Sequence, residues 1–136
     1  FRSDSLFQAI IINNVDDPII KNDYAYVIAE REESKIEDLN YALEIVQEAI
    51  NIEPNNAAFL DTIGWIFYKL GTFKKAEEYI QKSLSINNTN LVILEHLGDI
   101  YIELNKTEEA LKIYQQILDF DSNNKTIKNK IDKLNE

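Results

Sequence analysis

The 136-residue sequence contains no cysteine and no methionine, and it has only three glycines, two prolines and one histidine. Without cysteine the chain has no disulfide, no thiolate nucleophile and no cysteine-ligated metal, so cysteine usage leaves the compartment undetermined. Three glycines are too few for a glycine-rich phosphate loop, and no serine or threonine nucleophile motif is present. The sequence therefore predicts a protein that is not an enzyme.

Basic residues and long apolar runs are also scarce. Fourteen lysines and arginines stand against 24 aspartates and glutamates, which gives a net charge of −10. Nucleic acids and anionic membranes are bound by basic patches, so we expect neither as a partner. The longest apolar runs, such as Ala9–Ile12, fall far short of the roughly 18 residues that a transmembrane helix needs. Direct insertion into a membrane is therefore not expected.

What the chain does contain is an internal repeat. The segment Ala57–Leu84 recurs 34 positions later as Leu91–Leu118. The matching pairs include Leu60 and Leu94, Gly64 and Gly98, Phe67 and Tyr101, Leu70 and Leu104, and Ala76 and Ala110. Each copy holds two apolar stripes with helical spacing. One such unit cannot bury its apolar face alone, so the sequence predicts an all-α array of stacked repeats.

The repeat resembles the tetratricopeptide repeat (TPR) family. The positions that fit the family pattern are Leu60, Ile63, Gly64 and Phe67 on the first helix and Ala76 and Ile80 on the second. Leu60 stands where the pattern has tryptophan, and Ser122 stands where a proline follows the third helix pair. The resemblance implies a right-handed superhelical solenoid of antiparallel helical hairpins that acts as a non-enzymatic scaffold for protein binding, here the C-terminal part of a longer bacterial protein.

The repeat register divides the chain into five parts. We expect residues 1–14 to be the second helix of a truncated preceding repeat, residues 18–56, 57–90 and 91–124 to be three repeats, and residues 125–136 to be a polar capping helix. In the first repeat about five residues are inserted near positions 32–40, because Ala25 and Ala42 lie 17 positions apart whereas Gly64 and Ala76 lie 12 apart. Gly71 and Asn105 are expected to end first helices in the left-handed conformation.

In TPR arrays the first helices line a concave groove, and the resemblance places eight residues of this chain there. They are Asn22, Tyr26 and Glu30 in the first repeat, Asp61, Trp65 and Tyr68 in the second, and Glu95 and Asp99 in the third. This groove is aromatic at its middle and acidic toward its C-terminal end, so we expect a peptide or protein partner with basic and apolar residues. Trp65 is the best single candidate for an anchor. Alternatively, its ring packs against the neighbouring repeat.

Other interpretations concern metals and assembly. His96 and Asp99 lie three positions apart on one helical face, but two ligands are a weak metal signal, and we expect no metal and no other cofactor. The chain is alternatively a regulatory or targeting appendage of a larger enzyme, or a self-association module. Leu6, Ala9 and Ile10 form an apolar stripe at the truncated end, which predicts a homodimer through the first helix.

Overall fold

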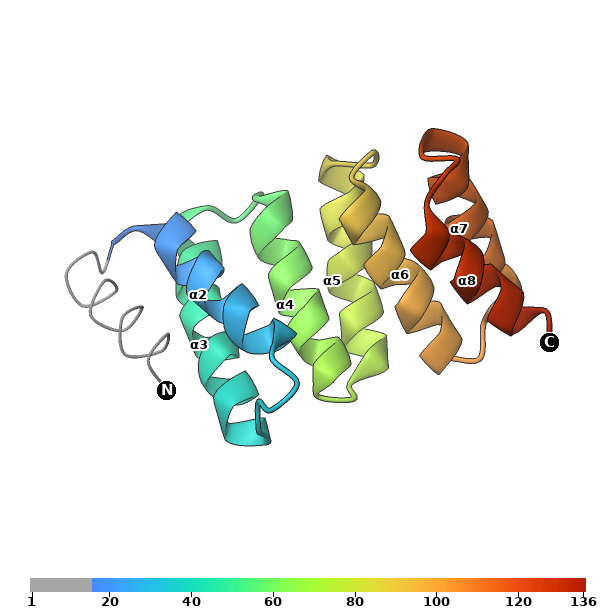
Figure 1. The fold of residues 1–136 in the computed structure, drawn as a ribbon. Coiled ribbons are helices and arrows are strands. Elements are labelled where there is room, and N and C mark those ends of the chain that lie inside the picture. Colours follow the sequence, from blue (N-terminus) through green and yellow to red (C-terminus); the bar gives the residue numbers. More distant parts are fainter. Residues whose placement is uncertain (1–15) are drawn as a thin grey trace.

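The computed structural model describes residues 16–136, which form seven α-helices and no β-strand. The helices are α2 (Pro18–Glu30), α3 (Ile36–Ile52), α4 (Ala57–Lys69), α5 (Phe73–Ile86), α6 (Leu91–Glu103), α7 (Thr107–Phe120) and α8 (Lys125–Leu134). They follow one another as antiparallel hairpins in a single row (Figure 1). The helix expected over residues 1–14, and with it the dimer contact through Leu6, Ala9 and Ile10, lies outside the described residues.

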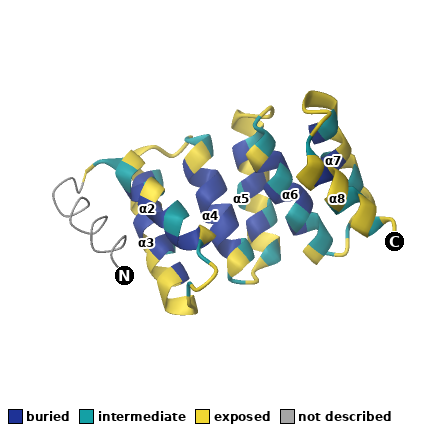
Figure 2. Cartoon of the chain, in the orientation of Figure 1, coloured by how far each residue is buried: buried dark blue, intermediate teal, exposed yellow. Residues whose placement is uncertain are grey.

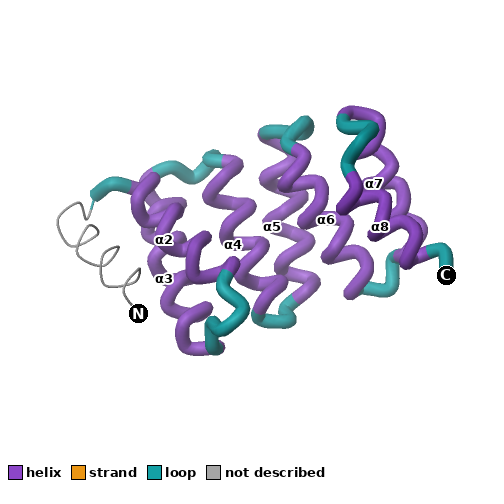
Figure 3. The backbone as a smooth tube through the Cα atoms, viewed as in Figure 1, coloured by secondary structure: helices purple, strands orange, loops and turns teal. Residues whose placement is uncertain are grey.

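The helices form two layers. One layer contains the first helices of the hairpins, α2, α4 and α6, together with α8. The other layer contains the second helices, α3, α5 and α7 (Figure 3). Each second helix packs against its own first helix and against the first helix of the next hairpin, so α3 contacts α4 and α5 contacts α6. The three hairpins span residues 18–52, 57–86 and 91–120. Within residues 16–136, no helix has both the length and the apolar character that crossing a bilayer demands.

Asparagine side chains explain where the first-layer helices begin. Asn56, Asn90 and Asn124 are the N-caps of α4, α6 and α8, and they occupy the same position of successive repeats in the sequence. The side-chain oxygen of Asn56 accepts a hydrogen bond from the Phe59 backbone N–H at 3.1 Å, which satisfies one of the unpaired donors at the helix start. Asp17 caps α2 in the same way, ahead of Pro18 in the first turn.

The turns inside the second and third hairpins need a backbone with positive φ. Gly71 has a φ of 82° and Asn105 has a φ of 61°, so both predicted left-handed ends are confirmed. The first hairpin is different because its extra residues lengthen both the linker and the second helix. Its linker is residues 31–35, and α3 has 17 residues whereas α5 has 14. The hydroxyl of Ser34 donates to the carbonyl of Ile28 at 2.7 Å and holds this longer linker against the end of α2.

Small residues set the distance between the helices of a hairpin. A Cβ atom added to Gly64 would lie 2.7 Å from Ile80 Cδ1, closer than side chains approach one another. Ala76 and Ala110, the small residues predicted on the second helices, are fully buried. These contacts show why the repeat keeps small residues at these positions: a larger side chain would separate the helices.

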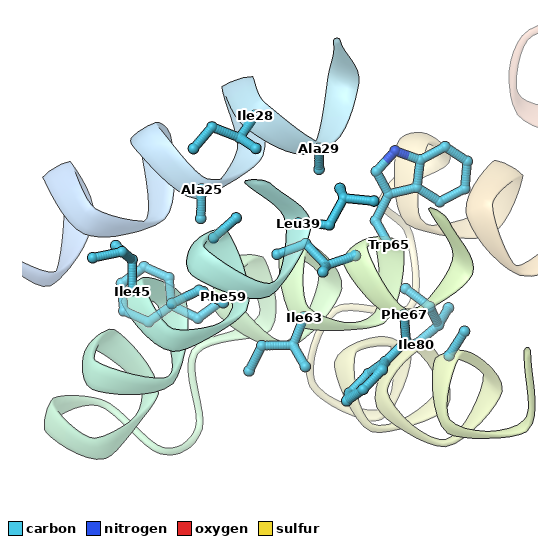
Figure 4. Packing of buried hydrophobic residues seen from close by; sticks show 14 of the residues in the cluster. Ala25, Ile28, Ala29, Leu39, Ile45, Phe59, Ile63, Trp65, Phe67 and Ile80 are labelled. Carbon is cyan, nitrogen blue, oxygen red and sulfur yellow. The ribbon is translucent and has the colours of Figure 1, made fainter. Parts of the chain in front are cut away.

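The core consists of two apolar clusters between the helices, and buried residues run through every hairpin (Figure 2). Figure 4 shows part of its larger cluster, to which α2, α3, α4 and α5 all contribute. A second cluster joins α6, α7 and α8 and includes Ile127, which is completely buried. The polar helix α8 therefore packs its one buried side chain against the apolar face of the third hairpin.

Candidate functional site

All eight predicted groove residues lie on first-layer helices. Asn22, Tyr26 and Glu30 are on α2, Asp61, Trp65 and Tyr68 are on α4, and Glu95 and Asp99 are on α6. We call the surface that they form with Lys130 of α8 the groove. Asn22, Tyr26, Tyr68, Glu95 and Asp99 are half-buried and Glu30 is exposed, whereas Asp61 and Trp65 are buried.

Trp65 lies in a stack of three rings at the middle of the groove. Its ring centroid is 4.5 Å from that of Tyr68 and 3.9 Å from that of His96, and both partner rings are nearly parallel to it. Its indole Nε1–H donates to the carboxylate of Glu30 at 2.6 Å. Only 8% of Trp65 is exposed, so its environment is the one described by the alternative interpretation, in which it packs against the neighbouring repeat. Trp65 joins α2, α4 and α6 and offers little free surface.

His96 and Asp99 do not face a common ligand. His96 Nδ1 is 2.8 Å from Asp61 Oδ1, and both side chains are buried. Asp99 instead accepts hydrogen bonds from the Tyr114 hydroxyl and from Lys130. Within residues 16–136, no three side chains of the metal-binding types lie together. The two residues belong to separate hydrogen-bonded groups.

The acidic end of the groove contains a cation supplied by the chain itself. Lys130 Nζ donates to Glu95 Oε2 at 2.6 Å and to Asp99 Oδ1 at 2.9 Å, and it lies 5.8 Å from the centre of the Tyr114 ring. Burial alone would lower the pKa of Lys130, but its hydrogen bonds to Glu95 and Asp99 outweigh burial and raise it. Lys130 is not among the predicted groove residues, because the polar pattern of residues 125–136 predicts only a capping helix. The signal was present, since Lys130 follows His96 by one full repeat.

The pairs Asp61–His96 and Glu95–Lys130 are two steps of one pattern, which we call the inter-repeat ladder. Each step joins residues 35 positions apart, and Asp61 and Glu95 occupy equivalent places one repeat apart. Asn22 precedes Asp61 by one repeat plus the insertion, and Thr62 precedes His96 by one repeat. The equivalent first step would therefore join Asn22 to Thr62. This step is not made. The Thr62 hydroxyl donates to the Ala58 carbonyl at 3.1 Å, and Asn22 Oδ1 is buried without a hydrogen bond.

A hollow of about 400 Å³ lies at this first step, between α2, α4 and the start of α6. Its lining consists of Asn22, Asp23, Tyr26, Val27, Ala57, Ala58, Asp61, Thr62, Asn87, Asn90, Val92 and Ile93. Burial, and then the negative charges of Glu30, Asp61 and Glu95, raise the pKa of Tyr26 to about 12. Burial and the neighbouring Asp17 also raise the pKa of Asp23. This part of the groove is therefore electronegative.

A second hollow, of about 320 Å³, lies beside Lys130 at the other end of the groove. Tyr68 and Ile102 contribute to its lining, together with Leu134 of α8. Burial, followed by the negative charges of Asp99 and Glu103, raises the pKa of Tyr68, although Lys130 acts in the opposite direction. A hollow therefore lies near each end of the groove.

Comparison with known proteins gives a consistent family. The family model described as tetratricopeptide repeat matches residues 67–134. A search of curated protein sequences gives no match. Many solved structures share the fold, among them TTC0263, a thermophilic TPR protein in Thermus thermophilus, with a TM-score of 0.80 at 19% identity over 94% of this chain and 69% of that one.

Two further similar structures are described by their peptide sites. YrrB, a TPR protein with an unusual peptide-binding site, gives a TM-score of 0.74 at 19% identity, covering 92% of this chain and 62% of its own. The first TPR of Spaghetti (RPAP3), bound to the HSP90 peptide SRMEEVD, gives 0.68 at 22% identity, covering 82% of this chain and 92% of its own. At these identities the likeness shows the fold, and it confirms the predicted all-α, right-handed superhelical solenoid.

Proposed function

The chain belongs to the tetratricopeptide repeat family, and on that premise we propose that it is a non-enzymatic scaffold that binds a peptide, or an extended segment of a partner protein, in the groove. The observation that carries this proposal is the hollow of about 400 Å³ between three successive first-layer helices. It combines apolar walls with half-buried polar groups, which is the usual composition of a recognition site. Peptide sites in the similar structures YrrB and Spaghetti support the same interpretation.

The charge of the groove suggests which peptides it binds. Asp23 and Glu30 of α2 and Asp61 of α4 make this end of the groove electronegative, and after burial the charges of Glu30 and Asp61 contribute to the raised pKa of Tyr26. The peptide bound to Spaghetti, SRMEEVD, carries three carboxylate side chains, and a groove of the present charge would repel such a sequence. We therefore propose a partner segment with basic and apolar residues, whose affinity falls as salt screens the attraction.

Selection of peptides from a random display library against the 136-residue chain tests this proposal. Selected sequences should be enriched in lysine, arginine and apolar residues, and they should lose affinity for Asp23→Lys. The matched control is Glu78→Lys, which makes the same charge change at an exposed site on α5 in the other layer. If no peptide is selected, or if the two variants weaken binding equally, the groove is not the binding surface.

A further inference from the structure

The hollow between α2, α4 and α6 is lined by both apolar side chains and polar oxygen atoms. We propose that it is a subsite for one basic side chain, arginine or lysine, which donates hydrogen bonds to Asn22 and to the carboxylate of Asp23. This inference rests on the proposed function and deepens it, because it names the chemistry that the groove recognises at one position.

The lining of the hollow matches both parts of such a side chain. Val27, Val92 and Ile93 provide apolar walls that suit the methylene stem of arginine or lysine. Asn22 and Asp23 provide oxygen atoms that accept from the charged head. Among residues 16–136, no lysine or arginine lines the hollow. A cation that enters therefore meets acceptors without a competing positive charge in the described lining.

The inter-repeat ladder shows how this chain completes the same position elsewhere. Thr62, His96 and Lys130 occupy equivalent places in successive repeats. At the second step His96 pairs with Asp61, and at the third step Lys130 pairs with Glu95. At the first step the side chain is only a threonine, whose hydroxyl donates within its own helix. The hollow lies at the step where the chain provides no long nitrogen-bearing side chain.

Asn22 supplies the unsatisfied acceptor. Its Oδ1 atom is buried and accepts no hydrogen bond, which is an unfavourable state for a polar atom. The terminal torsion of asparagine is broad, so the amide is able to turn its oxygen toward a donor that enters the hollow. An arginine or lysine head group carries several N–H donors and no acceptor, and it therefore suits a site built from an amide oxygen and a carboxylate.

Titration of the ¹⁵N-labelled 136-residue chain with N-acetyl-L-arginine amide, followed by NMR, tests the subsite without a known partner. The matched control probe is N-acetyl-L-citrulline amide, which has nearly the same shape and no charge. We expect the arginine probe to shift the signals of Asn22, Ala58 and Thr62, and we expect the citrulline probe to bind about tenfold more weakly because a charged hydrogen bond is lost. Equal effects of both probes, or shifts only around Glu95 and Asp99, would overturn the proposal.

Two variants move the affinity in opposite directions. Asn22→Asp gives the first step of the ladder the carboxylate that the other two steps have, and we expect it to strengthen binding of the arginine probe about tenfold. Asp23→Asn removes one carboxylate at an exposed position and should weaken it by a similar factor. A purely structural role of Asn22 would not produce the gain. Unchanged affinity in both variants would contradict the subsite.

Thr62→Lys tests the subsite with a cation supplied by the chain itself, because the new ammonium group would occupy the place proposed for the partner's cation. The Thr62→Lys variant should no longer bind the arginine probe. Thr62→Met has a side chain of similar length without charge, so it should lose only the part of the affinity that the larger side chain blocks. If Thr62→Lys does not fold, the two variants on α2 still decide the question. Peptides that bind the groove without requiring a basic residue here would refute the subsite and leave the proposed function intact.

Discussion

At the scale of single residues, two glycines determine how closely the helices of a hairpin approach. A Cβ atom on Gly64 would meet the flexible end of Ile80 at 2.7 Å, whereas a Cβ atom on Gly98 would meet the ring of Tyr114, with Cδ1 at 2.9 Å. Both side chains are buried, but that of Ile80 ends in a flexible aliphatic chain, whereas the hydroxyl of Tyr114 is hydrogen-bonded to Asp99 and holds its ring in place. The two glycines therefore tolerate a methyl group differently.

We predict that Gly98→Ala destabilises the chain more than Gly64→Ala. Alanine gains about 1 kcal/mol of helix propensity at either site, but overpacking against a rigid ring costs about 1–3 kcal/mol. The net change should be near zero for Gly64→Ala and a loss of about 1–2 kcal/mol for Gly98→Ala. Urea unfolding followed by circular dichroism measures both values. Equal free energies of unfolding for the two variants would show that the rigidity of Tyr114 is not the deciding factor.

Asp23 is proposed to bind the partner's cation, and we expect its charged carboxylate to destabilise the folded chain. Burial, together with Asp17, raises its pKa above the ordinary value of 3.8, so the folded state favours the protonated form. The stabilising contribution of this group is present below pH 3.8 and is lost as pH rises through the raised pKa. Asp23→Asn should therefore raise the melting temperature at pH 7 and have little effect at pH 3. A lower melting temperature at pH 7 would contradict the assigned cause of the shift.

At the scale of elements, α8 has two roles that its polar sequence conceals. Ile127 covers the apolar cluster between α6 and α7, and Lys130 reaches back to the carboxylates of Glu95 and Asp99. The first role completes the apolar cluster of the third hairpin. The second reduces the negative charge at the α8 end of the groove.

Removal of the buried side chain of Ile127 should show how much α8 contributes to the stability of the fold. We predict that Ile127→Ala lowers the free energy of unfolding by about 2–5 kcal/mol, the usual cost of removing a large aliphatic group from a packed site. Lys128→Ala, on the exposed side of the same helix, is the control and should change stability little. If both variants unfold at the same urea concentration, α8 does not contribute to the core as described.

The elements show how far sequence patterns determine this structure. Positive φ at Gly71 and Asn105 was predictable, because the backbone at each turn depends on local residue type. The neighbours of Trp65 were not predictable from helical periodicity, since Glu30 and His96 come from other repeats and reach Trp65 only through the stacking of the array. The number of inserted residues was predictable from the spacing of the repeats, but how they divide between the linker and α3 was not.

At the scale of the whole molecule, several groups make the fold sensitive to alkaline pH. The pKa of Tyr26 is raised to about 12, mainly by burial, and those of Tyr68, Tyr114 and Lys130 are also raised. A raised pKa means that the folded state holds its proton more tightly than the unfolded state. The resulting stability is fully present below the unfolded values of 10.0 for tyrosine and 10.5 for lysine, and it is lost above them.

We therefore predict that these groups leave stability unchanged between pH 7 and 9 and reduce it as pH rises from 10 to 12. Urea midpoints measured at constant ionic strength across this range provide the test. Lys130→Gln should lower stability at pH 8 and flatten the alkaline decline, since one of the titrating groups is gone. A decline that begins well below pH 9 would point to other groups.

The central claim is that a partner segment lies across α2, α4 and α6 and not on α3, α5 and α7. The most direct measurement is a map of NMR shift changes when the tightest selected peptide is added to the ¹⁵N-labelled chain. The account predicts the largest changes at Asn22, Tyr26, Ala58 and Thr62, with little change along α5. Changes concentrated on α3, α5 and α7, with the signals of α2 and α4 unmoved, would contradict it.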